Sequence, residues 1–213
     1  MGLREENKSR RMARVMSSIR SFLARNPIED LTMDGIAAAS RISVSTLYNY
    51  YGSKEMMLVA YCRDRMQECF AAARRLVENP PESAEAAYFE LLSIYLRGFG
   101  ALERPLVGSM IRILIVNQAR GTGVAGFQRN AFDQLRVLTR KLKDSGTLPT
   151  SAREDSIAFV LFGICSDLLF QFSLCNEVDI ETQVSRLGQC INLIYTGLAA
   201  REDTPPGLRG TNT

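Results

Sequence analysis

The segment from residue 43 to residue 50 combines short hydroxyl, amide and phenol side chains with few apolar ones. Ser43 can open a helix at Val44, because its hydroxyl can accept a free backbone N–H group of the first turn. Leu47 and Tyr51 are four residues apart and would share the inner side of this helix. A short helix of this kind buries little core, but it can hydrogen-bond to base edges in a DNA major groove. Its outward positions are Val44, Ser45, Thr46, Tyr48 and Asn49.

Two further helices are predicted before this segment, at about residues 8–25 and 32–40. Apolar residues recur at three- and four-residue steps in the first of them, and basic side chains occupy its other face. Thr32 is the N-cap candidate of the second helix, which has a small apolar face. The run Ser40-Arg41-Ile42-Ser43 interrupts the pattern and predicts a tight polar turn before the third helix, at about residues 43–50.

A family resemblance becomes specific at these positions. Ile36-Ala37, Ser43, Thr46-Leu47-Tyr48, Tyr51 and Ser53-Lys54-Glu55 resemble the helix-turn-helix signature of TetR-type (TetR/AcrR) transcriptional regulators. The resemblance covers roughly the first quarter of the chain. It implies an all-α fold, in which an N-terminal three-helix DNA-binding domain with a helix-turn-helix is followed by a helical ligand-binding and dimerisation domain.

This sequence departs from the family pattern in the turn. Arg41 stands where the family usually has Gly, and Val44-Ser45 stands where it often has a small residue or Lys followed by Gly. If the turn keeps the family geometry, Arg41 adopts a positive φ, a region that glycine tolerates better.

The resemblance also implies the roles of the DNA-binding residues. Lys54 is a phosphate contact, beside free N–H groups at the start of the next helix. Thr32, Tyr48 and Tyr50 are expected mainly at phosphates, and Val44, Ser45, Thr46 and Asn49 at base edges. Two alternatives stay open: Thr46 can bond to its own helix, and Tyr50 can pack on the fourth helix. The full predicted set is Thr32, Ser43, Val44, Ser45, Thr46, Tyr48, Asn49, Tyr50 and Lys54.

We predict three parts in the chain: a helix-turn-helix domain at residues 1–52, a helical effector-binding and dimerisation domain at 53–200, and a disordered tail at 201–213. Helical patterns cover about residues 53–78, 82–100, 124–144, 151–174 and 180–200, with a short apolar helix after Pro105. No strand pattern persists.

The last two helices predict a homodimer. The helix at 151–174 is apolar nearly all round, so it must bury two faces. We expect one face on the protomer core and one on a second protomer, in a four-helix interface; a monomer core is the alternative. The predicted interface residues are Ile157, Leu161, Ile164, Leu168, Val184, Leu187, Ile191 and Ile194.

An apolar effector pocket is expected within the body. The lack of a charge cluster favours a small apolar or aromatic effector, although each candidate is more often plain core than a ligand contact. The candidate lining residues are Tyr61, Tyr88, Leu92, Tyr95, Met110, Ile113, Asn117, Phe132, Phe162, Cys165, Phe170 and Gln171.

Composition excludes several classes of protein. The 213 residues contain no histidine, which removes the usual general base and the commonest metal ligand, so we expect no enzyme, no cofactor and no metal site. The five cysteines form no CxxC pair, which favours reduced thiols in the cytoplasm. No apolar run was expected to reach the ~18–20 residues that span a bilayer, so no membrane partner is predicted.

The charge distribution agrees with a nucleic-acid-binding N-terminus. Residues 1–65 hold 11 Lys and Arg against 7 Asp and Glu, whereas the net charge of the whole chain is +3. The leading hypothesis is a ligand-released repressor that binds a palindromic operator in double-stranded DNA as a dimer. The alternative is a helical protein-interaction module that has lost specific DNA binding.

Overall fold

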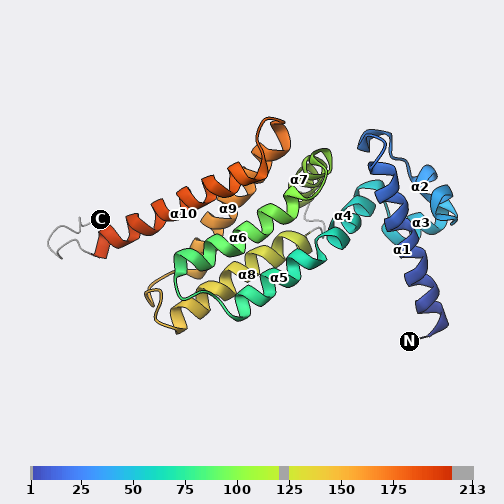
Figure 1. Ribbon diagram of the computed structural model, residues 1–213. Helices are drawn as coiled ribbons and strands as arrows, with labels where there is room; N and C mark the ends of the chain where they lie inside the picture. The colour runs from blue at the N-terminus through green and yellow to red at the C-terminus, as the bar shows by residue number, and fades with distance from the viewer. Residues whose placement is uncertain (1, 120–124, 203–213) are drawn as a thin grey trace. The chain divides into compact units, whose positions relative to one another are not determined.

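The computed structural model describes residues 2–119 and 125–202, and at residues 3–4, 113–119, 125–129 and 197–202 it describes the backbone only. Across these ranges the chain forms ten α-helices, one short 3-10 turn and no strand (Figure 1). The predicted all-α fold is therefore confirmed. Residues 203–213, most of the predicted tail, lie outside the described ranges.

The three N-terminal helices lie close to their predicted positions. They are α1 (Leu3–Leu23), α2 (Met33–Ser40) and α3 (Val44–Tyr51), with the turn η1 (Ile28–Asp30) between α1 and α2. Helix α1 begins five residues before the predicted start at residue 8, because its first turns need no apolar face. Glu5 and Glu6 lie near the positive end of the helix dipole, and Arg10 pairs with Glu6 at 3.0 Å.

The chain divides into two compact units. The first contains Met1–Glu68 and Leu102–Phe127, and the second contains Cys69–Ala101 and Gln128–Thr213. The functional domain boundary predicted at residue 52 stays a prediction. By packing, two further helices, α4 (Lys54–Arg65) and α7 (Arg104–Ala119), fall in the same compact unit as the N-terminal helices. The reason is packing: α4 contacts α1, α3 and α7, and its Met57 is fully buried.

The helix predicted over residues 53–78 is broken at one position. Helix α4 ends at Arg65, and α5 (Gln67–Glu78) begins after Met66, whose φ and ψ are −95° and 9°. Met66 is 1% exposed, so its side chain is fixed by packing. The local sequence contains neither glycine nor proline, and therefore gives no signal for this break.

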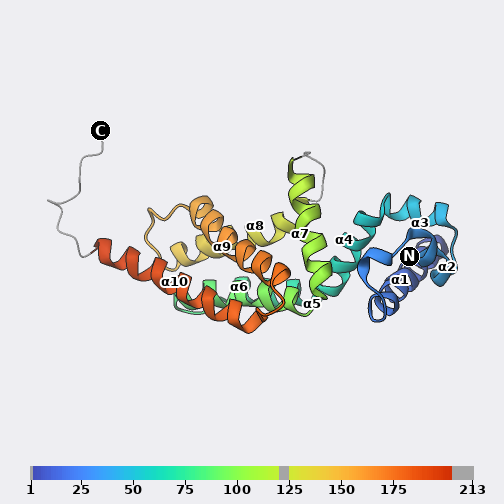
Figure 2. The same ribbon diagram turned by 90° about the horizontal axis from the view of Figure 1, so that it is seen from above.

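The second unit is built around α6 (Ala84–Gly100). Helix α10 (Ile180–Glu202) lies along α6, and α9 (Glu154–Leu174) contacts both, as the two views agree (Figures 1 and 2). Helix α8 (Ala125–Asp144) joins α6 through a hydrogen bond of 2.9 Å between the hydroxyls of Thr139 and Tyr88. Arg97 of α6 and Glu181 of α10 form a bidentate ion pair, in which both N···O distances are 2.9 Å.

Helix α9 corrects one expectation from the sequence. It is 21 residues long with a mean hydropathy of 1.9 in its most apolar window, so by length and composition it could cross a bilayer. Only 33% of that window is buried. Core helices of soluble proteins can have the same length and composition. On α9, however, Phe159, Val160, Phe170 and Leu174 are exposed.

Gly100 sets the approach of α6 to α10. A Cβ atom at this position would lie 2.5 Å from Cγ1 and 2.8 Å from Cβ of Ile180, which is nearer than such atoms approach in real structures. Since Ile180 begins α10, the whole helix end would have to shift.

We expect Gly100→Ala to lower the free energy of unfolding by about 1–3 kcal/mol, because the added methyl overpacks the α6–α10 contact. Urea unfolding followed by circular dichroism measures the change. Gly188→Ala is the matched control, because its Cβ would meet only the edge of the Phe89 ring, at 3.3 Å. Equal midpoints for Gly100→Ala and the parent would contradict this account.

Candidate DNA-binding site

Side-chain caps fix the start of each helix in the helix-turn-helix. The Thr32 hydroxyl accepts from the N–H of Gly35 at 3.1 Å, and the Ser43 hydroxyl accepts from the N–H of Thr46 at 3.1 Å. Both predicted caps are therefore present. The Ser43 hydroxyl also lies 2.7 Å from the Thr46 hydroxyl and 3.0 Å from that of Ser45. The first turn of α3 thus carries a cluster of three linked hydroxyls, in which the Thr46 hydroxyl is already paired with that of Ser43.

The inner side of α3 is held by a small apolar core. Leu47 is fully buried and Tyr51 is 9% exposed, as their four-residue spacing predicted. Leu31 and Ile36 are buried with them, and α1 adds Val15 and Ile19. Because these residues fix one side of α3, the opposite side is held at a defined angle to the domain.

The outer side of α3 carries the predicted base-edge and phosphate residues. Ser45, Tyr48 and Asn49 are exposed, and Tyr48 has 48% of its surface open to solvent. Val44, Thr46 and Tyr50 are half-buried. The Tyr50 ring meets the Tyr51 ring edge-on at 6.4 Å between centroids, so Tyr50 packs partly within the domain, although its contact is with α3 itself.

Lys54 lies at the first position of α4. Ser53 caps this helix by accepting from the N–H of Met56 at 3.2 Å. The ammonium of Lys54 donates to the backbone carbonyl of Glu29 at 3.2 Å, which links α4 to the turn before α2. A carbonyl does not neutralise the ammonium, so its charge remains available to an anion.

The turn between α2 and α3 has the left-handed conformation expected for it. Arg41 has φ 55° and ψ 49°, and it is the one non-glycine residue with positive φ in the described ranges. The N–H of Arg41 donates to Ala38 and that of Ile42 to Ala37, each at 3.1 Å, which closes a Schellman motif. Arginine therefore occupies the position where this motif usually has glycine, without changing the shape of the turn.

We expect Arg41→Gly to raise the free energy of unfolding by up to about 1 kcal/mol. A left-handed conformation costs an L-residue roughly 1–2 kcal/mol, and part of that gain is offset by the greater freedom of glycine in the unfolded chain. Arg41→Ala keeps the strained backbone and serves as the control in the same urea titration. The interpretation fails if the glycine variant is no more stable than the alanine variant.

Comparison with known proteins agrees with this geometry. Residues 16–61 match the model of the family described as bacterial regulatory proteins, tetR family. FadR from Thermus thermophilus, a TetR-family transcriptional repressor solved with lauroyl-CoA, matches with TM-score 0.64 and 18% identity over 84% of this chain and 92% of that one. Residues 16–61 therefore carry the N-terminal domain of the tetR family, and the chain as a whole is similar in fold to TetR-family regulators. It has the fold of a TetR-family transcriptional regulator with a helix-turn-helix DNA-binding domain.

Two other solved TetR-type structures match to a similar extent. FadR from Bacillus subtilis, in complex with stearoyl-CoA, has TM-score 0.64 and 12% identity over 84% of this chain and 96% of that one. A regulator from Syntrophomonas wolfei has TM-score 0.69 and 15% identity over 90% of this chain and 97% of that one. No curated protein matches the sequence.

The predicted effector residues fall into several environments. Tyr61 and Met110 are buried in the first unit, whereas Tyr88, Leu92, Tyr95 and Cys165 are buried in the second. The Phe132 and Phe162 rings pack edge-on at 6.1 Å, Phe170 is 43% exposed, and Gln171 lies on the side of α9 that faces α10. Ile113 and Asn117 lie outside the described side chains. The set stays a prediction.

The sequence-based set missed the polar partners of two of these tyrosines. The Tyr95 hydroxyl donates to Gln134, whose amide donates to Asn130 at 3.3 Å. The Tyr88 hydroxyl pairs with Thr139. Gln134 and Thr139 are both buried beside the stripe of Leu135, Leu138 and Leu142 on α8. In the sequence, these partners could have been found as polar residues that lie next to the apolar stripe of a helix.

All five cysteines carry free thiols. Burial raises the pKa of Cys69 and of Cys165 to about 12, and it raises the pKa of Cys62 still further. These three thiols therefore remain protonated near neutral pH, a state in which they are weak nucleophiles.

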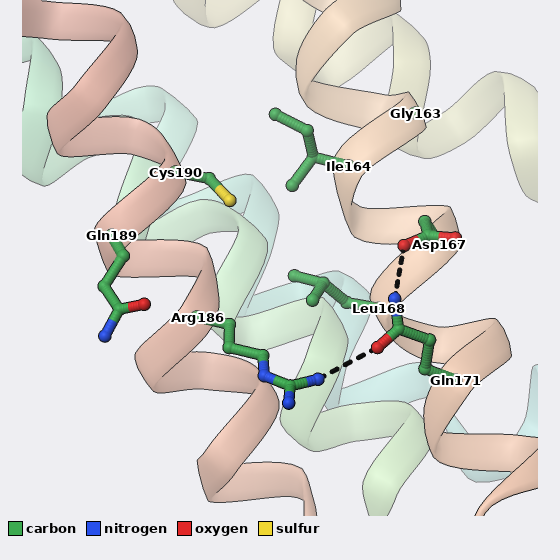
Figure 3. A pocket seen from close by; sticks show the side chains of 8 residues that line it. All are labelled: Gly163, Ile164, Asp167, Leu168, Gln171, Arg186, Gln189 and Cys190. Carbon is green, nitrogen blue, oxygen red and sulfur yellow. Dashed lines mark hydrogen bonds between the residues drawn. The ribbon is translucent and has the colours of Figure 1, made fainter.

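An open cavity of about 450 Å³ lies between α9 and α10 (Figure 3). A polar chain crosses it: Arg186 donates to Gln171 at 2.9 Å, and Gln171 donates to Asp167 at 2.6 Å. Cys190 of α10 and Ile164 of α9 point into the space between the helices (Figure 3). We call this feature the α9–α10 groove; its lining is Gly163, Ile164, Asp167, Leu168, Gln171, Arg186, Gln189 and Cys190.

The predicted dimer residues lie mostly on the inner faces of α9 and α10. Leu161, Leu168, Val184, Leu187 and Ile191 are buried in the protomer, and Ile157, Ile164 and Ile194 are half-buried. Only Ile164 and Leu168 of the eight reach the groove. The exposed apolar residues of the two helices are Phe159, Val160, Phe170, Leu174 and Leu193. Helical periodicity identified residues that share a face, but not which neighbour that face meets.

Proposed function

We propose that this chain is a ligand-released repressor that binds a palindromic operator as a dimer. The observation that carries the proposal is the polar outer side of α3, held away from the domain core by buried Leu47 and by the caps at Thr32 and Ser43. In a two-fold dimer, two such helices would enter major grooves about one helical turn apart, ~34–36 Å.

The exposed side chains of α3 support direct reading of bases. Asn49 is suited to a bidentate contact with adenine, and the methyl groups of Val44 and Thr46 are suited to a thymine methyl. Tyr48 and Lys54 border this face and would contact phosphates, which set the register without reading sequence. The alternative, a protein-interaction module, was favoured mainly by Arg41; that support weakens because the turn closes in the ordinary Schellman pattern.

The α9–α10 groove supports a second copy of the chain as its cover. The exposed apolar residues Val160, Leu174 and Leu193 lie on the two helices that form the groove, and two helices from each protomer would make a four-helix interface. A membrane is a poorer cover, because Asp167 lies near the middle of α9 and a charged carboxylate is costly in a bilayer.

We infer an apolar or aromatic effector for the second unit, because its interior around Tyr88 and Tyr95 is mostly apolar. The hydroxyls of these two tyrosines are already paired with Thr139 and Gln134, so an apolar ligand would not leave either of them unsatisfied. The FadR neighbours were solved with lauroyl-CoA and stearoyl-CoA, whose acyl chains are apolar. Repression would be released to the extent that the ligand prefers a dimer shape that no longer matches the half-site spacing. Free thiols and a DNA target agree with a cytoplasmic protein.

We expect selection from a randomised duplex pool to recover a palindromic consensus. Asn49→Ala should weaken binding to that consensus by about 1–3 kcal/mol and relax the preference at one position in each half-site. Fluorescence anisotropy on matched and single-mismatch duplexes measures both effects. Asn79→Ala, an exposed asparagine of the second unit, is the control. Recovery of no consensus, with sequence-blind binding only, would favour the protein-interaction module.

We expect Val160→Glu to convert the dimer into a monomer, because it places a charge in the proposed interface. Val137→Glu is the matched control: Val160 is 48% exposed on α9 and Val137 is 42% exposed on α8, so neither change disturbs a buried site. Sedimentation velocity measures the assembly state. A monomeric parent protein that pellets with lipid vesicles would instead assign the exposed face of α9 to a membrane.

A further inference from the structure

The helix-turn-helix carries a net negative formal charge, which is unfavourable for binding DNA. Between Ile28 and Glu55 the chain contains four carboxylates but only two cations, Arg41 and Lys54. The carboxylates, Glu29, Asp30, Asp34 and Glu55, are all exposed. Hydrogen bonds from its own backbone N–H and from Ser53 hold the pKa of Glu55 below its usual value, so this group stays ionised. Duplex DNA carries one negative charge per ~1.7 Å, and each cation of this segment therefore matters.

The two cations are held differently. Lys54 donates to the carbonyl of Glu29 and is positioned by that bond. Arg41 is exposed, and it forms no ion pair or side-chain hydrogen bond with any residue in the described ranges. Its guanidinium is therefore the unengaged positive charge of the helix-turn-helix.

The backbone places Arg41 just before the N-terminus of α3. It lies two residues before Ser43, the cap of that helix, in a turn closed by the N–H groups of Arg41 and Ile42. Nothing in the packing requires an arginine side chain here, and glycine would remove the strain of the positive φ. Strain of this kind is concentrated at functional positions, where the surrounding structure maintains it.

We propose that Arg41 binds a DNA phosphate beside the major groove entered by α3. This inference rests on the proposed function and adds a contact at a position where the family resemblance assigns none. A phosphate is the target because Arg41 extends from the turn and not from the outer side of α3, where base edges are read. The N-terminal half of α1 carries further exposed cations, Lys8, Arg11 and Arg14.

The test is a salt titration of binding to the selected operator with four proteins: the parent, Arg41→Gly, Arg41→Lys and Arg75→Gln. We expect Arg41→Gly to weaken binding about three- to tenfold at low salt. Its dimer should lose about 1.8 from the slope of log K against log salt, ~0.9 for each of two phosphates. The loss should be equal on operator and mismatched duplexes, because a phosphate contact carries no sequence information.

The remaining variants separate charge from other effects. Arg41→Lys keeps the cation and should retain the parent slope, whereas a bidentate guanine contact would be lost. Arg75→Gln removes an exposed charge of α5 and should change neither affinity nor slope. Thermal unfolding of Arg41→Gly should show no loss of stability, so weaker binding is not a folding defect.

Two results would overturn the inference. One is an Arg41→Gly protein with the affinity and slope of the parent, and the other is an Arg41→Lys protein that loses slope as the glycine variant does. In both cases the parent still selects an operator, so the proposed function stands. A parent protein that selects no operator would overturn the proposed function and this inference together.

Discussion

Helices α2 and α3 have only eight residues each, and a helix of that length does not persist alone in water. Their existence therefore depends on one shared apolar core, in which Leu47 of α3 meets Ile36 of α2 and the buried side of α1. The caps at Thr32 and Ser43 each satisfy one free backbone N–H of the first turn and so fix where the helix begins. Because the core is on one side only, the chain can present the other side of α3 as a polar surface without loss of stability.

In the second unit, the main constraint is the apolar surface of α9. Helix α9 is apolar nearly all round, so the protomer can satisfy one of its faces and leaves another open. The polar groups near this open face are fixed in place: buried Gln183 donates to the carbonyl of Leu168 at 2.9 Å, and Arg186, Gln171 and Asp167 form a chain above it. Satisfied polar networks define one register between two helices more sharply than apolar contact does. The groove between α9 and α10 therefore has a defined shape before any partner arrives.

Much of the architecture could be predicted because local chemistry and tertiary packing agree. The hydroxyl caps and the spacing of Leu47 and Tyr51 were available from the order of residues, whereas the positive φ at Arg41 was available only from the family resemblance. The break at Met66 was not, since a methionine flanked by good helix formers interrupts a helix only through packing. The start of α1 was missed because charge pairs, not apolar residues, support its first turns. For α9 and α10, periodicity grouped the residues correctly, but the outer and inner faces are distinguished only by what the rest of the chain covers.

The connection from α3 to α4 has a mechanical consequence. Only Gly52 and Ser53 separate the two helices, and Ser53 is itself bound into the first turn of α4. The Lys54 bond to the carbonyl of Glu29 adds a second link, which bypasses α3 and reaches the turn before α2. Because the connection is two residues long and is fixed by hydrogen bonds at Ser53 and Lys54, it leaves α3 little freedom to move relative to α4. A rotation of α4 within the first unit would therefore carry α3 with it, and would change the direction in which the polar outer side of α3 points.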